Sequence, residues 1–352
     1  MHPTETTLLV GPELETEAKR LFLALMNAEC EPGRPWDYEG CLRIAPLTLE
    51  INRLKREQGA VILAHSYVAP EITYGVSDFR GDSYFLSLMA RESNARKIVF
   101  AGVVFMAETA KIISPNATVV VPDRGSGCSL ADSLTGAALR KLKSGYPGAV
   151  VVCYINSTAE VKAESDVCVT SGNAVDIISR LPDQRILFVP DRLMGENIRA
   201  ELRRRGVDKE IITSDGTCIV HDKFDVLSLN VTRRRFPGVK IVAHPECAPD
   251  VAAAADFVGS TGAMMRYVRE TKAPYFLMLT ECGLVDRLQV EVPEKTFVGG
   301  CRLCPFMKLN SLENVLQALR SPTAGQEINL DEAVRARAAR CIDRMFELSP
   351  KD

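Results

Sequence analysis

The sequence predicts an α/β protein made of three similar units, each a parallel sheet covered by helices. Three observations indicate this fold. Short apolar, strand-like segments alternate with helix-like segments along most of the chain, which is typical of parallel sheets. Equivalent apolar segments open three stretches of the chain, at 60–64, 149–153 and 239–243. Each stretch then ends in a strand-like segment, a turn and a cysteine.

The composition excludes several classes of protein. The 352 residues are 46% hydrophobic, enough for sizeable cores, and the formal charge is −2. Without long basic or acidic runs, nucleic acid and anionic membranes are not expected as partners. No apolar run approaches the roughly 18 residues of a transmembrane helix. The first residues lack the pattern of a signal peptide, so we expect a cytoplasmic protein.

The first strand of each unit ends in two polar side chains that are separated by one intervening residue. These pairs are His65 and Tyr67, Tyr154 and Asn156, and His244 and Glu246. A helix-like segment follows each pair, so the pattern is an internal repeat of about 85 to 95 residues, the size of a small domain. Glu246 and Tyr67, beside their histidines, are candidate proton carriers.

A hydroxyl-rich turn forms the second signature of each unit. Ser83, Ser171 and Thr261 each lie where a helix is predicted to start. Any one of them alone is best interpreted as an ordinary helix N-cap. Three such helix starts directed at one centre favour a substrate with several anionic groups, because free N–H groups at helix N-termini bind carboxylate or phosphate.

The cysteines and histidines also fall at equivalent strand ends. In parallel α/β units, ligands bind at the carboxyl ends of the strands. A pseudo-threefold axis would bring to one centre Cys128, Cys218 and either Cys301 or Cys304, together with His65, His221 and His244. Three thiolates can hold zinc with a histidine or an iron–sulfur cluster. Their long spacing favours a central cofactor shared between the units.

We expect five segments along the chain. Residues 1–58 form an N-terminal extension with helices at 13–29 and 48–58, after a Pro/Gly-rich break at 31–35. The three αβα units are expected at 59–127, 128–217 and 218–304. Residues 305–352 are expected to form C-terminal helices, at 311–319 and 330–348, that pack on the body.

Several motifs extend this pattern in one fixed order along residues 58–312. They include Ala64-His65-Ser-Tyr67, Gly81-Asp82-Ser83, Gly127-Cys128-Ser129, Tyr154-Ile-Asn156, Thr170-Ser171-Gly-Asn173, Gly216-Thr-Cys218-Ile-Val-His221, His244-Pro-Glu246, Gly259-Ser-Thr261, Thr280-Glu281 and Cys304-Pro-Phe-Met307. With these motifs the chain resembles the quinolinate synthase family of de novo NAD biosynthesis. It departs from the family pattern at Ser66 and Val68, and its first fifty residues have no counterpart.

The resemblance implies a fold and a reaction. The implied fold is three αβα sandwich domains around a pseudo-threefold axis, with the active site at the centre. The implied reaction condenses iminoaspartate with dihydroxyacetone phosphate to quinolinate, releasing phosphate and water. The resemblance also implies a [4Fe–4S] cluster on Cys128, Cys218 and Cys304, whose open iron acts as a Lewis acid. The choice of Cys304 over Cys301 comes from the matching Cys-Pro-Phe-Met segment.

The resemblance also implies roles for individual residues. The catalytic residues would be His65, Tyr67, His244 and Glu246. The substrate-binding residues would be His65, Ser83, Tyr154, Asn156, Ser171, His221, His244, Glu246 and Thr261. The implied partners are the two small-molecule substrates and an enzyme that supplies iminoaspartate, either L-aspartate oxidase or aspartate dehydrogenase. Neither nucleic acid nor a membrane is among them.

Three other interpretations remain open from the residues. The chain could be a cluster-dependent hydro-lyase acting on another polyanionic substrate, or a redox or oxygen sensor. The third is a zinc site made by three cysteines and His221. For Cys301 the alternatives are a spare ligand, a redox partner of Cys304 and an ordinary turn residue.

Overall fold

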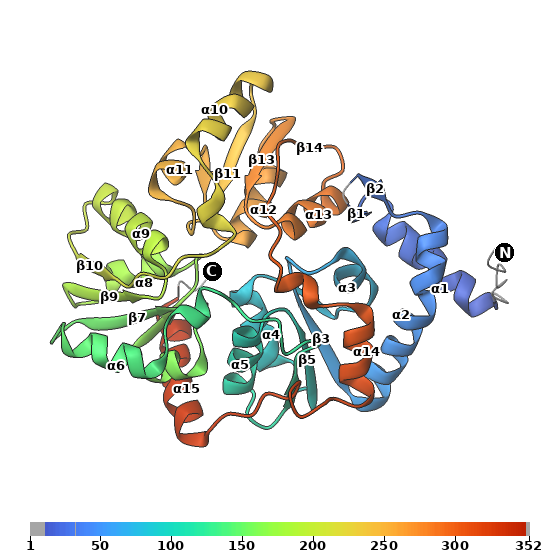
Figure 1. The fold of residues 1–352 in the computed structure, drawn as a ribbon, viewed down its shortest axis with the longest axis horizontal. Helices are drawn as coiled ribbons and strands as arrows, with labels where there is room; N and C mark the ends of the chain where they lie inside the picture. Colours follow the sequence, from blue (N-terminus) through green and yellow to red (C-terminus); the bar gives the residue numbers. More distant parts are fainter. Residues whose placement is uncertain (1–10, 32, 350–352) are drawn as a thin grey trace, which may run out of the picture.

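Three four-stranded parallel sheets surround a common centre in the computed structural model, which describes residues 11–31 and 33–349 (Figure 1). The first sheet lies in the blue and teal part of the ribbon, the second in the green part, and the third in the yellow and orange part. Helices cover the sheets. The predicted α/β class with repeated units is confirmed.

The three units have the same order of elements. In the first unit these are α2 (Tyr38–Gln58), β3 (Ala60–His65), α3 (Pro70–Gly75), β4 (Phe79–Gly81), α4 (Ser83–Glu92), β5 (Lys97–Ala101), α5 (Val104–Ile113) and β6 (Thr118–Val120). In the second they are α6 (Gly136–Ser144), β7 (Val150–Tyr154), α7 (Ala159–Ala163), β8 (Val167–Val169), α8 (Ala174–Arg180), β9 (Arg185–Val189), α9 (Arg192–Arg204) and β10 (Glu210–Thr213). In the third they are α10 (Val226–Arg235), β11 (Lys240–Ala243), α11 (Pro249–Ala254), β12 (Phe257–Val258), α12 (Thr261–Glu270), β13 (Tyr275–Leu279), α13 (Cys282–Glu291) and β14 (Thr296–Phe297).

The strand orders are equivalent as well. The sheets run β4-β3-β5-β6, β8-β7-β9-β10 and β12-β11-β13-β14. The two central strands of each sheet are nearly continuous apolar runs, and Ile186 and Phe188 of β9 are fully buried. This is expected of parallel strands that are covered on both faces. Among the described residues, no helix combines the length and the apolar character that crossing a bilayer requires.

An aspartate closes the first β-α-β turn of every unit. Its carboxylate accepts a hydrogen bond from a backbone N–H of the first strand, and its own N–H donates to the carbonyl of that same residue, at 2.8–2.9 Å in each case. The pairs are Asp78 with Ile62, Asp166 with Val151, and Asp256 with Ile241. Each aspartate thereby fixes the start of the second strand beside the first.

The N-terminal extension differs in detail from its prediction. Helix α1 (Pro12–Leu25) ends before residue 29, where a short antiparallel pair, β1 (Glu29–Glu31) and β2 (Arg34–Pro35), begins. Helix α2 begins at Tyr38 rather than at residue 48, because Asp37 caps it by accepting from the N–H of Gly40. Proline is disfavoured inside helices, so Pro46 obscures this start in the sequence.

The two predicted C-terminal helices are present. Helix α14 (Leu312–Arg320) packs against α2 and β5, and α15 (Glu332–Leu348) packs against α7 and β8. These two helices therefore return the end of the chain to the first and second units. Figure 1 shows α14 in orange-red beside α2, on the right, and α15 in red at the lower left.

We predict that Asp166→Ala lowers the free energy of unfolding by about 1–3 kcal/mol, because it leaves the N–H of Val151 without its charged acceptor. Asp166→Asn is the matched control, since its side-chain oxygen can still accept this hydrogen bond. Urea unfolding followed by circular dichroism measures both variants. Equal losses in the two variants would show that this hydrogen bond does not stabilise the turn.

Candidate functional site

A pocket lies where the carboxyl ends of the three sheets meet. All thirteen residues expected from the sequence line it. They are His65, Tyr67, Ser83, Cys128, Tyr154, Asn156, Ser171, Cys218, His221, His244, Glu246, Thr261 and Cys304. They come from all three units, so no single unit contains the site.

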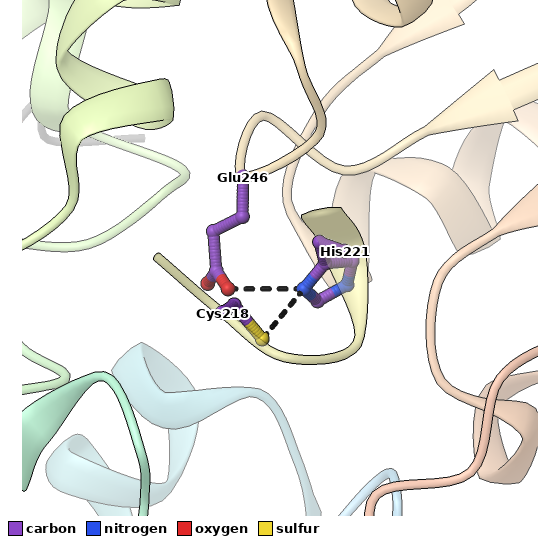
Figure 2. Close-up of side chains that lie close together, drawn as sticks. All are labelled: Cys218, His221 and Glu246. Atoms are coloured by element: carbon purple, nitrogen blue, oxygen red, sulfur yellow. Dashed lines mark hydrogen bonds and ion pairs between the residues drawn. The ribbon is translucent and has the colours of Figure 1, made fainter. Parts of the chain in front are cut away.

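The carboxylate of Glu246 is the most connected group in the pocket. The residue is 3% exposed. Its Oε1 accepts a hydrogen bond from the hydroxyl of Tyr154 at 2.6 Å and one from Nδ2 of Asn156 at 3.3 Å. Its Oε2 lies 2.9 Å from Nδ1 of His221 (Figure 2). Glu246 follows β11 of the third unit, whereas Tyr154 ends β7 of the second unit and Asn156 follows it, so these contacts join two units.

The surroundings of Glu246 set its charge and that of its neighbours. Burial opposes ionisation, but His221, His244 and the hydrogen bonds from His221 and Tyr154 hold the pKa of Glu246 below its usual range. Burial lowers the pKa of His244 to about 3, although Glu246 opposes this effect. Its ring stacks on His221 with the centroids 4.6 Å apart. At neutral pH the pocket therefore holds an ionised carboxylate beside a neutral His244.

Tyr67 reaches across the pocket from the first unit to the third. Its hydroxyl lies 3.1 Å from Oγ1 of Thr261 and 2.8 Å from Oγ1 of Thr280. Burial raises the pKa of Tyr67 well above its usual value, so the phenol keeps its proton. Its ring meets that of His65 edge to face at 4.5 Å, and burial lowers the pKa of His65 to about 3.

Two further residues contact the predicted site residues but were given no role by the sequence analysis. Thr280 contacts both Tyr67 and Nε2 of His221, the latter at 3.1 Å. Glu281 lines the pocket, and its Oε1 accepts from the N–H of Cys304 at 3.1 Å and pairs with Lys308 at 3.3 Å. Both residues follow β13 directly, so the rule that selected the other strand ends could have found them.

The hydroxyl-bearing turns lie at the pocket, but the predicted residues are not the helix caps. Ser83 and Thr261 are the first residues of α4 and α12, and the capping side chains are Asp82 and Ser260. Ser171 lies in the turn before α8. The hydroxyls of Ser83 and Thr261 therefore take no part in capping, and that of Thr261 contacts Tyr67 instead.

Asn156 provides an open acceptor. Its Nδ2 donates to Glu246, whereas its Oδ1 is buried and has no hydrogen-bond partner among the described residues. An unpaired buried carbonyl oxygen is unfavourable. The side chain is thus arranged to accept a hydrogen bond from a bound molecule.

The three cysteines occupy equivalent loops. Cys128, Cys218 and Cys304 follow the last strand of their unit, and their carbonyls accept the N–H of the residue four positions later at 2.8, 3.1 and 3.3 Å. All three are free and half-buried. The three loops thus present their thiols to the pocket in the same way.

The thiols are also close enough to influence one another electrostatically. Burial raises the pKa of Cys128 to about 12, and the charges of Glu246 and Cys304 add to this effect. Burial likewise raises the pKa of Cys218, where Glu246 and Cys128 contribute. Three free thiols that line one pocket fit a site that is completed by metal ions, since thiolates are metal ligands.

Cys301 is neither a pocket residue nor a partner of Cys304. It forms a disulfide with Cys282, the first residue of α13, with the Cα atoms 5.0 Å apart. The three alternatives considered for Cys301 from the sequence are therefore wrong. The pairing was missed because Cys282 and Cys301 are brought together by the ends of β13 and β14, which only the sheet places side by side.

A second set of metal-ligand atoms lies within the same pocket. One atom each of Cys218, His221 and Glu246 lies within 4.8 Å of the other two (Figure 2). His221 Nδ1 is 3.3 Å from the sulfur of Cys218. These three residues could hold a single ion such as zinc, for which cysteine, histidine and carboxylate are all suitable ligands.

Comparison with known proteins agrees with this geometry. The family described as "Quinolinate synthetase A protein" matches residues 49–347. The chain is 43% identical over 310 residues to "Quinolinate synthase" of Caulobacter vibrioides (strain NA1000 / CB15N), covering 87% of this chain and 83% of the relative. It is 46% identical over 293 residues to "Quinolinate synthase 2" of Mesorhizobium japonicum, covering 83% and 88%. It is 43% identical over 307 residues to "Quinolinate synthase" of Rippkaea orientalis, covering 85% and 92%. A match over most of the chain, with all thirteen predicted site residues lining one pocket, shows that the chain belongs to the quinolinate synthase family.

Proposed function

We propose that this chain condenses iminoaspartate with dihydroxyacetone phosphate to quinolinate, releasing phosphate and water, as a transferase of de novo NAD biosynthesis. The observation that carries the proposal is the convergence of the thirteen motif residues on one pocket. Family membership supplies the product, because the relatives are named for its synthesis. The cofactor, the roles of the residues and the course of the reaction are part of the proposal.

Cys128, Cys218 and Cys304 would hold a [4Fe–4S] cluster. The donor set fits, because three free thiols from three units line one pocket and favour metal when they lose their protons. Bound there, such a cluster supplies an iron with a free coordination position, which serves as a Lewis acid in the loss of water. The protein's own groups then have to bind, orient and move protons.

Binding and orientation would use the hydroxyl turns and Asn156. The first-turn N–H groups of α4 and α12, at Ser83 and Thr261, suit carboxylates and the phosphate of the triose substrate. Ser171, Tyr154, His65 and His221 complete the polar lining, and the open Oδ1 of Asn156 accepts a donor on the substrate. This lining suits two small substrates that carry several anionic groups.

Proton movement would use Glu246, His244 and Tyr67. The ionised carboxylate of Glu246 can take a proton during isomerisation of the triose unit, and the neutral ring of His244 can relay it. The phenol of Tyr67 keeps its proton at neutral pH and can donate it in a later step. His65, neutral and in contact with the ring of Tyr67, orients that ring.

The supply of substrate and the location of the reaction are part of the same proposal. Iminoaspartate would come from an aspartate-oxidising enzyme, L-aspartate oxidase or aspartate dehydrogenase. We place the reaction in the cytoplasm. Nine of the eleven cysteines are free in the structure, the three of the pocket among them, whereas Cys282 and Cys301 form a disulfide.

We predict that anaerobically purified protein contains about four irons and four labile sulfides per chain, as a [4Fe–4S] cluster requires. Cys128→Ala should lose the iron, the visible absorption and quinolinate formation together. Cys41→Ala is the control, because Cys41 is a free, buried cysteine on α2 outside the pocket. Zinc without sulfide would overturn the cluster assignment and favour a site on Cys218, His221 and Glu246.

We predict that Tyr67→Phe keeps the iron and sulfide content but lowers kcat by about 10²-fold or more, the usual contribution of a general acid. Chromatographic detection of quinolinate from the two substrates measures the rate. Tyr74→Phe is the control, since Tyr74 lies in the same unit and its hydroxyl bonds to Glu291 outside the pocket. Turnover at the wild-type rate in Tyr67→Phe would remove this phenol from the mechanism. If the wild-type protein forms no quinolinate, the substrates are different.

A further inference from the structure

Two loops of the pocket are held by the same arrangement of hydrogen bonds. Asn156 lies between Ile155 and Ser157, and the carbonyls of both neighbours accept from Nζ of Lys162, at 2.8 Å for Ile155. In the next unit, Glu246 lies between Pro245 and Cys247. The carbonyls of both accept from Nδ2 of Asn197, each at 2.8 Å.

Lys162 makes no other polar contact of this strength among the described residues. It belongs to α7, it is fully buried, and its Nζ lies 5.5 Å from the centroid of the Phe105 ring. No carboxylate in the described part of the chain forms an ion pair with it. Burying an ammonium group is costly unless hydrogen bonds compensate. The ammonium group of Lys162 is therefore stabilised by its hydrogen bonds to the two carbonyls that flank Asn156.

Asn197 acts between units. It belongs to α9 of the second unit, yet both of its carbonyl partners lie in the loop after β11 of the third unit. The carboxylate that this loop carries, Glu246, in turn contacts Tyr154 of the second unit. Asn197 thus ties the backbone of the loop to the unit that supplies a partner of Glu246.

The equivalent loop of the first unit makes different contacts. There the carbonyl of Tyr67 accepts from Nζ of Lys308 at 2.9 Å, and the hydroxyl of Ser66 accepts from Arg287 at 2.7 Å. Two side chains replace one, and only one of the bonds is to a carbonyl. The double-carbonyl arrangement is therefore present in the Asn156 and Glu246 loops but not in the equivalent loop of the first unit, so the repeat does not impose it.

We propose that Lys162 and Asn197 are positioning residues, which restrain the orientation of Asn156 and Glu246 by holding the peptide plane before each residue and the carbonyl of the residue after it. When the carbonyls before and after a residue are both held, the backbone of that residue and the direction of its Cα–Cβ bond are restrained. Functional groups need this support, because displacements of about 1 Å in a site can cost about 10²-fold in rate. The kinetic part of this inference rests on the proposed function.

Asn197→Leu tests the Glu246 loop, since leucine has a similar size and donates no hydrogen bond. We expect kcat for quinolinate formation to fall about tenfold or more with little change in KM, because Glu246 is the proton acceptor. Asn197→Gln keeps the donating group and should recover part of the loss. Asn52→Leu is the control, since Asn52 is also half-buried and donates to a backbone carbonyl, Gly75, away from the pocket.

Lys162→Met tests the Asn156 loop. We expect KM to rise about tenfold with a smaller change in kcat, because Asn156 is proposed to bind the substrate and not to move protons. Lys209→Met is a matched control. The Nζ of Lys209 also donates to two carbonyls separated by one residue, Leu181 and Asp183, at 2.6 and 2.7 Å, and these lie outside the pocket.

Hydrogen–deuterium exchange separates this inference from the proposed function. Each pair of hydrogen bonds, from Lys162 or from Asn197, is here called a clamp. Loss of the Lys162 clamp should speed amide exchange about tenfold in loop 154–158, and loss of the Asn197 clamp should do so in loop 244–248, with the other loop unchanged in each case. Unchanged exchange, or equal kinetic losses in the control variants, would overturn the inference. Faster exchange with wild-type kinetics would also overturn the positioning role. If the wild-type chain forms no quinolinate, the proposed function fails, and exchange alone decides whether the clamps exist.

Discussion

The carboxylate of Glu246 is buried, and much of the pocket is arranged to satisfy it. A buried carboxylate is stable only when it is hydrogen-bonded or paired. Its partners Tyr154 and Asn156 come from the second unit, and His221 lies beside its second oxygen. Because these groups are far apart in the sequence, satisfying this one charge requires the second and third units to meet in one relative position. Formation of the site and packing of the second unit against the third are therefore coupled.

The threefold repeat explains how such distant residues can meet. Each unit places two polar side chains at the end of its first strand and a cysteine after its last strand. The carboxyl ends of parallel strands lie at one edge of a sheet, so three sheets around one centre present three such edges to it. The aspartates at 78, 166 and 256 fix the same turn in every unit. The order of strands, turns and helices is thus repeated in the three units, whereas the side chains at the strand ends differ from loop to loop.

The cysteines show how position divides one residue type into several uses. Three of them occupy equivalent loops and face the pocket as free thiols. Cys282 and Cys301 are joined to each other, which ties the loop that carries Cys304 to the start of α13. Cys153 and Cys341 are buried in the core with their sulfurs 3.5 Å apart. The burial and the neighbours of each cysteine, rather than its spacing in the sequence, decide whether it faces the pocket, forms a disulfide or packs in the core.

The sequence alone determined the α/β class, the three units and the residues gathered at their strand ends, because strand period, turn residues and motif order are local properties. It also indicated which residues share the pocket, since equivalent positions in parallel units point to one edge. Only the tertiary structure decided which groups touch. The disulfide of Cys282 and Cys301, the position of Thr280 between Tyr67 and His221, and the reach of Asn197 into the next unit are contacts between segments distant in the chain. No local pattern encodes such contacts, because they depend on how whole sheets are placed beside one another.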